Sequence, residues 1–381
     1  MYAAENHIQL LKNNLSNEVW ESGCEWVWQQ IFPLSMDLTG KHSNQTLQTQ
    51  KKWSSINTMD PAYDQYEKAR EFYRTHEYLA WIGEDESDEE TIRSANEEAL
   101  DQSENANSPA NTDSASAKIS DQPMIYPMQQ LMDYDFLMKH FYNVHTSTTA
   151  DRELMNAKNL LSKDLTLEKE DAPQILIYHT HSQESYKNSK KDENVVAVGQ
   201  KLTDLLTEKG WNVYHDTTVY DLAVGKLDRS RAYTYALEGI NEILARYPSI
   251  QVVLDIHRDG VGEDVYLKTE IGGQPSARIM FFNGLSQTPE GPISYLANPF
   301  REDNLAFSLK LQLKAEEYYP GFTRKIYLKG LRYNQHLRAR SALVEVGAQT
   351  NTFEEACNAM MPLAELLDMV LQGNRKDSII Q

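Results

Sequence analysis

Two histidines and one glutamate have the side-chain types and the spacing of a metal site. His181 and Glu184 form an H-x-x-E pair, and His257 ends a later apolar run. Imidazole nitrogens and a carboxylate oxygen are protein ligands of catalytic zinc sites, which keep a fourth position for water. Because bound zinc lowers the pKa of that water to about 7, hydroxide forms at neutral pH. The set therefore predicts a Zn2+ site with hydrolysis as its chemistry.

A carboxylate and a further histidine belong to the same prediction. Glu345 is the ionisable residue of the apolar run 342–346, and a buried carboxylate costs free energy unless it is paired. A role as proton shuttle beside the water would explain it. His179 is expected to be an alternative ligand or a residue that supports one, because on an extended segment it points to the same side as His181. H-x-x-E alone arises often by chance, so the hypothesis depends on His257 and Glu345 standing at predicted strand ends.

Three polar side chains have roles that rest on their chemistry. Arg258 follows His257, and its planar guanidinium suits a substrate carboxylate. Arg332 and Asn334 are expected to polarise or orient the substrate carbonyl, as electrostatic stabilisation requires. The alternative for each is an ordinary ion pair of the surface or interior, and both interpretations stay open.

The elements that must position these residues alternate along the chain. Short apolar runs predict strands, and segments with helical periodicity separate them. The predicted strands are residues 174–178, 211–214, 251–257, 277–282 and 342–346, and the predicted helices are residues 151–165, 194–209, 229–246, 302–318 and 352–371. This alternation indicates an α/β fold with a largely parallel sheet. Ligand sites of such sheets gather at the carboxyl ends of the strands, where the candidate ligands and Glu345 stand.

The chain divides into four predicted regions. Residues 1–83 are rich in tryptophan and tyrosine at roughly helical spacing, which predicts a helical segment with an aromatic core or, alternatively, a ligand surface. Residues 84–122 form an acidic linker, in which residues 84–105 contain ten acids and one base. Such a composition is typical of a solvated tether. Residues 123–172 lead into the catalytic domain, residues 173–381.

Composition excludes several classes of protein. The net charge is −19 and the pI is about 5.0, which argues against a nucleic-acid-binding protein because such proteins usually carry a basic patch. Two cysteines, Cys24 and Cys357, are too few for a disulfide framework. No apolar run approaches the roughly 20 residues of a membrane span, and the first residues show no signal peptide. We therefore expect either a cytoplasmic protein or an export segment outside this chain.

Four runs of sequence carry a family resemblance. They are residues 175–186 (ILIYHTHSQESY), 255–259 (DIHRD), 331–335 (LRYNQ) and 343–347 (LVEVG), followed by Asn351 and Glu355. In content and order they resemble the stage II sporulation protein P family, cell-wall hydrolases of endospore-forming bacteria. The resemblance extends from about residue 134 to residue 371 and does not cover residues 1–122.

The resemblance implies a fold and an activity. The family is similar to zinc-dependent N-acetylmuramoyl-L-alanine amidases, with a three-layer α/β fold around a mixed sheet. Such an enzyme cuts peptidoglycan at the amide between N-acetylmuramic acid and L-alanine of the stem peptide, and an endopeptidase activity on stem-peptide cross-links is attributed to the family as well. Matching motifs make His181, Glu184 and His257 the metal ligands and Glu345 the catalytic carboxylate.

The resemblance also implies a setting. The family acts during engulfment in sporulation, in a membrane complex with a lytic transglycosylase and another membrane protein. It therefore implies an extracytoplasmic, membrane-associated enzyme, although the anchor that family members carry is not visible in this chain.

Two alternatives to a wall amidase remain. A zinc carboxypeptidase has the same order of H-x-x-E, histidine and distant glutamate, but it needs a closed pocket with an arginine for the terminal carboxylate. A non-catalytic wall-binding scaffold would have a decayed site. Against decay, the four candidate positions His181, Glu184, His257 and Glu345 all keep competent side chains.

Overall fold

The computed structural model describes residues 123–222 and 227–373. The predicted helical segment of residues 1–83 and the predicted acidic linker of residues 84–122 lie outside the described residues. In chain order the elements are α6 (Met128–Leu131), α7 (Tyr134–Phe141), β1 (Tyr142–Val144), α8 (Ala157–Ser162), β2 (Ile175–Tyr178), α9 (Val195–Glu208), β3 (Val213–His215), α10 (Arg229–Arg246), β4 (Val252–Asp259), β5 (Lys268–Ile271), β6 (Gln274–Ala277), β7 (Ile279–Gly284), β8 (Gln287–Thr288), β9 (Gly291–Pro292), η2 (Ser294–Leu296), α11 (Arg301–Tyr318), β10 (Ile326–Lys329), β11 (Ser341–Ala348) and α12 (Phe353–Gln372).

Seven strands of the described chain form one mixed sheet. Their order is β1-β10-β7-β11-β4-β2-β3, and every neighbouring pair is parallel except β7 and β11. The strands β2, β3, β4 and β11 therefore end at one edge of the sheet, and β1, β7 and β10 end at the opposite edge. The predicted α/β fold with a mixed, largely parallel sheet is confirmed.

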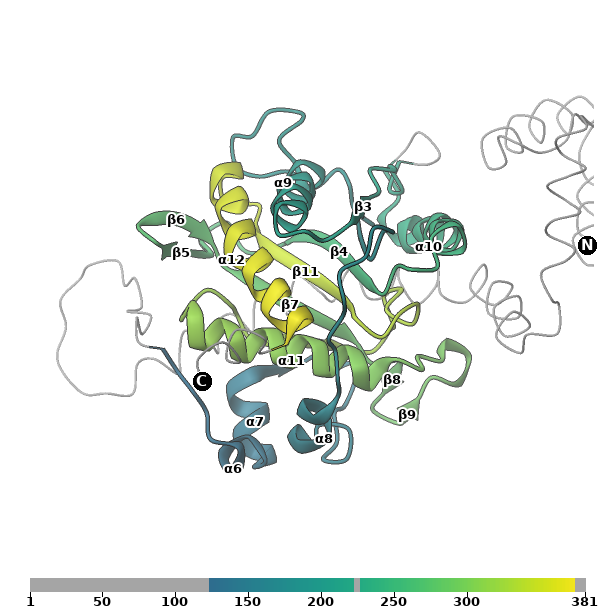
Figure 1. Cartoon of the computed structure of the whole chain (residues 1–381), viewed down its shortest axis with the longest axis vertical. Helices are drawn as coiled ribbons and strands as arrows, with labels where there is room; N and C mark the ends of the chain where they lie inside the picture. The colour runs from purple at the N-terminus through teal and green to yellow at the C-terminus, as the bar shows by residue number, and fades with distance from the viewer. Residues whose placement is uncertain (1–122, 223–226, 374–381) are drawn as a thin grey trace, which may run out of the picture. The chain divides into compact units, whose positions relative to one another are not determined.

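Helices cover both faces of this sheet and make a three-layer domain. On one face, α9, α11 and α12 pack over the apolar side chains of the central strands (Figure 1). On the opposite face, Ile240 and Leu244 of α10 belong to one buried cluster with Leu176 of β2 and Val253 of β4. Since successive side chains of a strand point to opposite faces, both clusters draw on the same strands.

Local side-chain caps explain where the longer helices begin. Asn194 accepts hydrogen bonds from the first turn of α9, and Asp228 accepts one from the first turn of α10. Thr352 and Glu355 form a reciprocal capping box at the start of α12. Such caps satisfy N–H groups that have no partner inside the helix. No helix within residues 123–222 and 227–373 is long and apolar enough to cross a membrane.

Three of the elements that differ from the sequence prediction are α8, β1 and β10. A helix over residues 151–165 was expected, but α8 spans only Ala157–Ser162. The side chain of Asp151 caps a separate turn, and Asn156 caps α8 from an extended backbone conformation, so the two segments do not merge. The strands β1 and β10 were not predicted, because they contain only three and four residues and show no alternation of apolar and polar side chains.

Candidate metal centre

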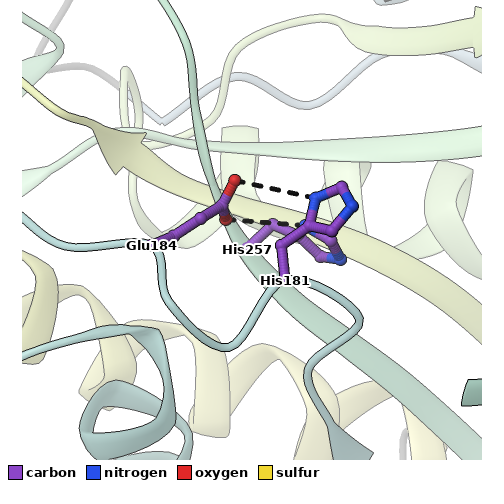
Figure 2. Close-up of side chains that lie close together, drawn as sticks. All are labelled: His181, Glu184 and His257. Carbon is purple, nitrogen blue, oxygen red and sulfur yellow. Dashed lines mark ion pairs between the residues drawn. The ribbon is translucent and has the colours of Figure 1, made fainter. Parts of the chain in front are cut away.

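The turn after β2 carries two of the candidate ligands. β2 ends at Tyr178, and within the turn the backbone N–H of Glu184 donates to the carbonyl of His181 at 3.2 Å. His257 comes from β4, the neighbouring strand. Figure 2 shows the Glu184 carboxylate facing both imidazole rings, with Oε1 3.8 Å from His181 Nδ1 and Oε2 3.5 Å from His257 Nδ1. One ligand atom of each of the three residues lies within 4.8 Å of the others, so the structure brings the predicted set together.

The donor set of this cluster fits a divalent metal ion. Both Nδ1 atoms face the carboxylate, while the second ring nitrogens face other oxygens. His181 Nε2 lies 3.4 Å from the carbonyl oxygen of Arg229, and His257 Nε2 lies 2.8 Å from Asp255 Oδ1. Oxygens beside the second ring nitrogen are typical of metal-ligating histidines, and the contact of His257 with Asp255 is an ion pair. Two imidazoles and a carboxylate also match the protein ligands of a catalytic site with an open position.

The charges within the cluster favour a cation. Burial alone would raise the pKa of Glu184, but the hydrogen bond and charge of His257, with the charges of His181 and Arg229, lower it to about 2. Burial alone would lower the pKa of His257, but Asp255 and then Glu184 raise it well above 6.5. Burial, followed by the charge of His257, lowers the pKa of His181 to about 4, which leaves its ring neutral and able to bind a metal.

Hydrogen bonds hold the Glu184 carboxylate at both oxygens. Arg229 Nη2 donates to Oε1 at 3.0 Å, and the backbone N–H of Arg258 donates to Oε2 at 3.0 Å. Arg229 is the first residue of α10, and Arg258 follows His257 in β4. Charge-assisted bonds of this kind are stronger than neutral ones, so α10 and β4 together fix the position of this ligand.

Asp255 connects the turn to β4. Asp255 is 2% exposed. Oδ1 accepts the backbone N–H of Thr180 at 2.9 Å, and Oδ2 accepts the Thr180 hydroxyl at 2.6 Å. Because Asp255 also lies against His257 Nε2, one buried carboxylate orients a histidine on its own strand and the start of the turn that carries His181.

Glu345 lies beside the cluster on β11. It pairs in register with His257 on the parallel strand β4, and such strands are about 4.8 Å apart. Its Oε2 is buried and has no hydrogen-bonding partner in the described part of the chain. Burial raises the pKa of Glu345, and the negative charge of Asp259 raises it further, to about 8. A carboxyl group of this pKa can both accept and donate a proton near neutral pH.

A tyrosine of α10 forms one wall of the site. The Tyr233 ring lies 5.4 Å from the His181 ring and 6.3 Å from the His257 ring, centroid to centroid. Asn334 Nδ2 donates to the carbonyl of Tyr233 at 2.9 Å, so the amide of Asn334 supports this wall. Arg332 Nη1 donates to the carbonyl of Ala297 at 3.2 Å. The roles predicted for Asn334 and Arg332 on a substrate carbonyl stay predictions.

The Arg258 side chain also bonds to the backbone. Nε donates to the carbonyl of Ser185 and Nη1 to the carbonyl of Asp259, each at 3.1 Å. These contacts hold the guanidinium next to the turn that carries Glu184 and do not use Nη2. Its role in binding a substrate carboxylate stays a prediction as well.

His179 does not join the cluster. Its Nδ1 lies 3.0 Å from the carbonyl oxygen of Ile256, and its Nε2 lies 2.9 Å from His215 Nε2. A Cβ added at Gly199 of α9 would meet the His179 ring at 2.5 Å, so the ring packs toward α9. The extended conformation that would place His179 and His181 on one side ends with β2, and the interpretation of His179 as a competing ligand was wrong.

Sequence reasoning missed the residues that surround the ligands. Asp255 had a usable signal, because it stands two positions before His257 in a predicted strand and therefore on the same face. Arg229 and Tyr233 begin a predicted helix that is distant in sequence, and no pattern connects them to the H-x-x-E pair. Their contacts arise from the packing of α10 against β4.

The three-layer α/β domain brings two histidines and a glutamate together, with the half-buried carboxyl group of Glu345 beside them, and so contains a candidate metal centre. The chain belongs to the stage II sporulation protein P family, because the family model "Stage II sporulation protein P (SpoIIP)" matches residues 41–368. Stage II sporulation protein P of Bacillus subtilis (strain 168) is 28% identical over 214 residues, covering 51% of this chain and 50% of that protein. The chain thus spans about half the length of this curated relative. The family assignment is confirmed, but its predicted start near residue 134 was wrong, since the match begins at residue 41.

Two solved amidases are similar to parts of the chain at low scores. The N-acetylmuramoyl-L-alanine amidase AmiC2 of Nostoc punctiforme is 12% identical with a TM-score of 0.32, covering 53% of this chain and 99% of that chain. The apo form of the N-acetylmuramyl-L-alanine amidase Ami1 from Mycobacterium abscessus is 14% identical with a TM-score of 0.27, covering 51% and 99%. Scores this low support no inference about activity.

Proposed function

We propose that this protein is a zinc-dependent peptidoglycan hydrolase. It cleaves the amide between N-acetylmuramic acid and L-alanine of the stem peptide, with stem-peptide cross-links as a second substrate. The observation that carries the proposal is the cluster of His181, Glu184 and His257 with Glu345 in register on the adjacent strand. Membership of a sporulation protein family supports the choice of substrate.

Each residue of the site has a role in this proposal. His181, Glu184 and His257 would hold Zn2+, which supplies Lewis-acid activation of water and carbonyl groups. Glu345 accepts a proton from the attacking water and donates it to the departing amide nitrogen, a use that its pKa of about 8 permits. Asp255 keeps the His257 ring oriented so that Nδ1 faces the other ligands.

Substrate binding falls to residues around the cluster. Arg258 lies beside the ligands with Nη2 not used in its backbone contacts, which suits a carboxylate of the stem peptide. Arg332 and Asn334 are proposed to orient the scissile carbonyl. Because each already donates to a backbone carbonyl, they would act partly by holding the loop between β10 and β11.

The biological setting is proposed from the family alone. The protein would act outside the cytoplasm at the membrane, on peptidoglycan, during engulfment in sporulation. A lytic transglycosylase and a further membrane protein would be its partners, and nucleic acid would not be bound.

Digestion of purified peptidoglycan sacculi tests the proposal. The full chain is incubated with sacculi in the presence of Zn2+ or of a chelator, and the products are identified by mass spectrometry. We expect free stem peptides with an L-alanine N-terminus, formed with Zn2+ and not with chelator. A parallel assay on a short peptide with a free C-terminus distinguishes a carboxypeptidase from an amidase. If only the short peptide is cut, the amidase proposal is wrong, and if neither is cut by zinc-loaded protein, a binding protein is the better description.

A further inference from the structure

The connection between β3 and α10 contacts the turn that carries two of the candidate ligands. Asp221 in this connection is 1% exposed. Its Oδ1 accepts the hydroxyl of Ser182 at 2.7 Å, and its Oδ2 accepts the backbone N–H of Gln183 at 3.1 Å. Ser182 and Gln183 are the two residues between His181 and Glu184. One buried carboxylate therefore holds the whole span between two ligands.

The connection between β3 and α10 also leads to Arg229, the first residue of α10, which contacts both His181 and Glu184. The carbonyl of Asp221 accepts the backbone N–H of Asp228 at 2.8 Å, and Asp228 caps α10. The next residue, Arg229, donates to Glu184 Oε1 at 3.0 Å, and its carbonyl oxygen lies 3.4 Å from His181 Nε2. The contacts of Asp221 thus form part of a continuous path from the middle of the turn to both of its ends.

Burying the Asp221 carboxylate costs free energy that its hydrogen bonds must offset. Burying a charge is unfavourable unless hydrogen bonds satisfy it. Asp221 uses both oxygens on the turn, and hydrogen bonds to an ionised acceptor are stronger than bonds to a neutral one. A turn held at its middle loses less conformational freedom when its two ends bind the same ion, and such pre-organisation increases affinity.

We propose that Asp221 is a positioning residue of the metal centre, which sets the affinity for the metal through Ser182 and Gln183 without touching the ion. The inference rests on the metal centre of the proposed function. Residues that support metal ligands from outside typically contribute a factor of about 10 to 100 in metal affinity. Asp221 lies outside all of the sequence motifs that carry the family resemblance.

Asp216 offers a matched control in the same connection. It is 6% exposed and accepts hydrogen bonds from Thr218 N, Thr218 Oγ1 and Tyr220 Oη. Its side-chain bonds stay inside the connection. Asp216→Asn therefore changes a buried aspartate of the same segment without loosening the turn between His181 and Glu184.

The experiment compares Zn2+ affinity in three variants of the full chain. Zn2+ dissociation constants are measured by competition with a chromophoric chelator, and unfolding midpoints are measured for the metal-free proteins. We expect Asp221→Asn to raise the Zn2+ dissociation constant about tenfold or more, because a neutral amide replaces the two charge-assisted hydrogen bonds to Ser182 and Gln183 by weaker ones. Ser182→Ala, a milder change, should raise it by a smaller factor, and Asp216→Asn should leave it within about twofold although its unfolding midpoint falls.

The outcomes separate this inference from the proposed function. If the unaltered protein does not bind Zn2+, the proposed metal centre is wrong. If it binds Zn2+ and both Asp221→Asn and Ser182→Ala keep its affinity, Asp221 has no positioning role. Equal losses of affinity in Asp221→Asn and Asp216→Asn would also overturn the inference, because the effect would then follow stability alone. If Asp221→Asn does not fold, Ser182→Ala decides.

Discussion

The two faces of β4 and β11 share a backbone but differ in chemistry. On the face under α9, α11 and α12, the side chains are aliphatic and fully packed: Val252, Leu254 and Ile256 of β4, and Ala342, Val344 and Val346 of β11. On the opposite face the same strands present Asp255, His257 and Asp259 of β4, and Glu345 of β11. The alternation of side chains along a strand places these two sets back to back.

The difference shows how one sheet can separate stability from chemistry. The aliphatic face gains free energy in proportion to the apolar area that it removes from water. The ionisable face contains buried charges, which cost free energy unless they are paired, and it leaves Glu345 Oε2 without a partner in the described residues. Substitutions on one face should therefore change folding, and substitutions on the other should change metal binding and catalysis.

The largest expected effect is the loss of the metal. We predict that His181→Ala binds no stoichiometric Zn2+ and releases no product from sacculi above background, because one of three protein ligands is absent. His215→Ala is the matched control, since His215 lies on β3 and bonds to His179 outside the cluster. Metal analysis of the purified variants checks the prediction. Retention of one Zn2+ per chain by His181→Ala and also by His257→Ala would show that the site is elsewhere.

The second-largest expected effect is a loss of catalysis without loss of the metal, on substitution of Glu345. We predict that Glu345→Gln keeps its Zn2+ and loses hydrolysis by a factor of about 100 to 10,000, the usual contribution of a general acid–base residue. Val344→Ala is the control from the opposite face, because Val344 is the preceding residue and packs in the aliphatic core. Rates on soluble muropeptides, normalised to bound zinc, make the comparison. Full activity in Glu345→Gln would remove this residue from the proton-transfer role.

The division between the faces also explains how much of the fold the sequence could predict. The boundaries of α9, α10 and α12 agree with the prediction to within one residue or so, because the caps Asn194, Asp228 and Thr352 are local signals. β1 and β10 were missed because they are strands only through their pairing with each other and with β7. A three-residue segment has no periodicity that could reveal such a partner.

The site residues that stand in predicted strands could be predicted from the sequence. His257 and Glu345 could be expected on one edge because both stand in predicted parallel strands, and the structure pairs them in register. His179 was misinterpreted because an extended backbone was assumed past Tyr178, where the chain turns. Asp221 and Arg229 could not be found, since their contacts with the turn depend on how a distant connection packs.

A third prediction concerns the aliphatic face. Phe281 of β7 is fully buried in the core under α11 and α12. We predict that Phe281→Ala lowers the free energy of unfolding by about 3–5 kcal/mol, the usual cost of a large cavity, while the folded fraction keeps its Zn2+ affinity. Phe282, its neighbour, faces the other way and lies 4.6 Å from the Tyr333 ring. Denaturant unfolding and zinc titration of Phe281→Ala, with Phe282→Ala as the comparison from the opposite face, check this. A weaker Zn2+ affinity in Phe281→Ala at unchanged stability would contradict the division between the faces.

The smallest expected effect is electrostatic. It concerns Asp368 of α12, one of the helices that cover the aliphatic face. Burial alone would raise the pKa of Asp368 in α12, but hydrogen bonds from Gln372, Trp211 and Lys169 lower it below its ordinary value of 3.8. A carboxylate with a lowered pKa in the folded state contributes stability above the unfolded pKa and loses it as the pH falls through the folded pKa. We predict that Asp368→Asn costs about 1 kcal/mol at pH 7. The difference from the unaltered protein should shrink below about pH 4.

Unfolding in denaturant at pH 7, 5 and 3, with chelator present, measures this difference. The chelator matters because metal release at low pH would otherwise add a pH dependence that belongs to the ionisable face. Zn2+ affinity at pH 7 should be the same in Asp368→Asn and in the unaltered protein, since Asp368 bonds to Trp211 and Lys169 on the far side of the sheet from His181 and His257. A constant difference in unfolding free energy down to pH 3 would mean that shape, and not charge, is what Asp368 contributes. A change in Zn2+ affinity would mean that the two faces of the sheet are coupled through β4.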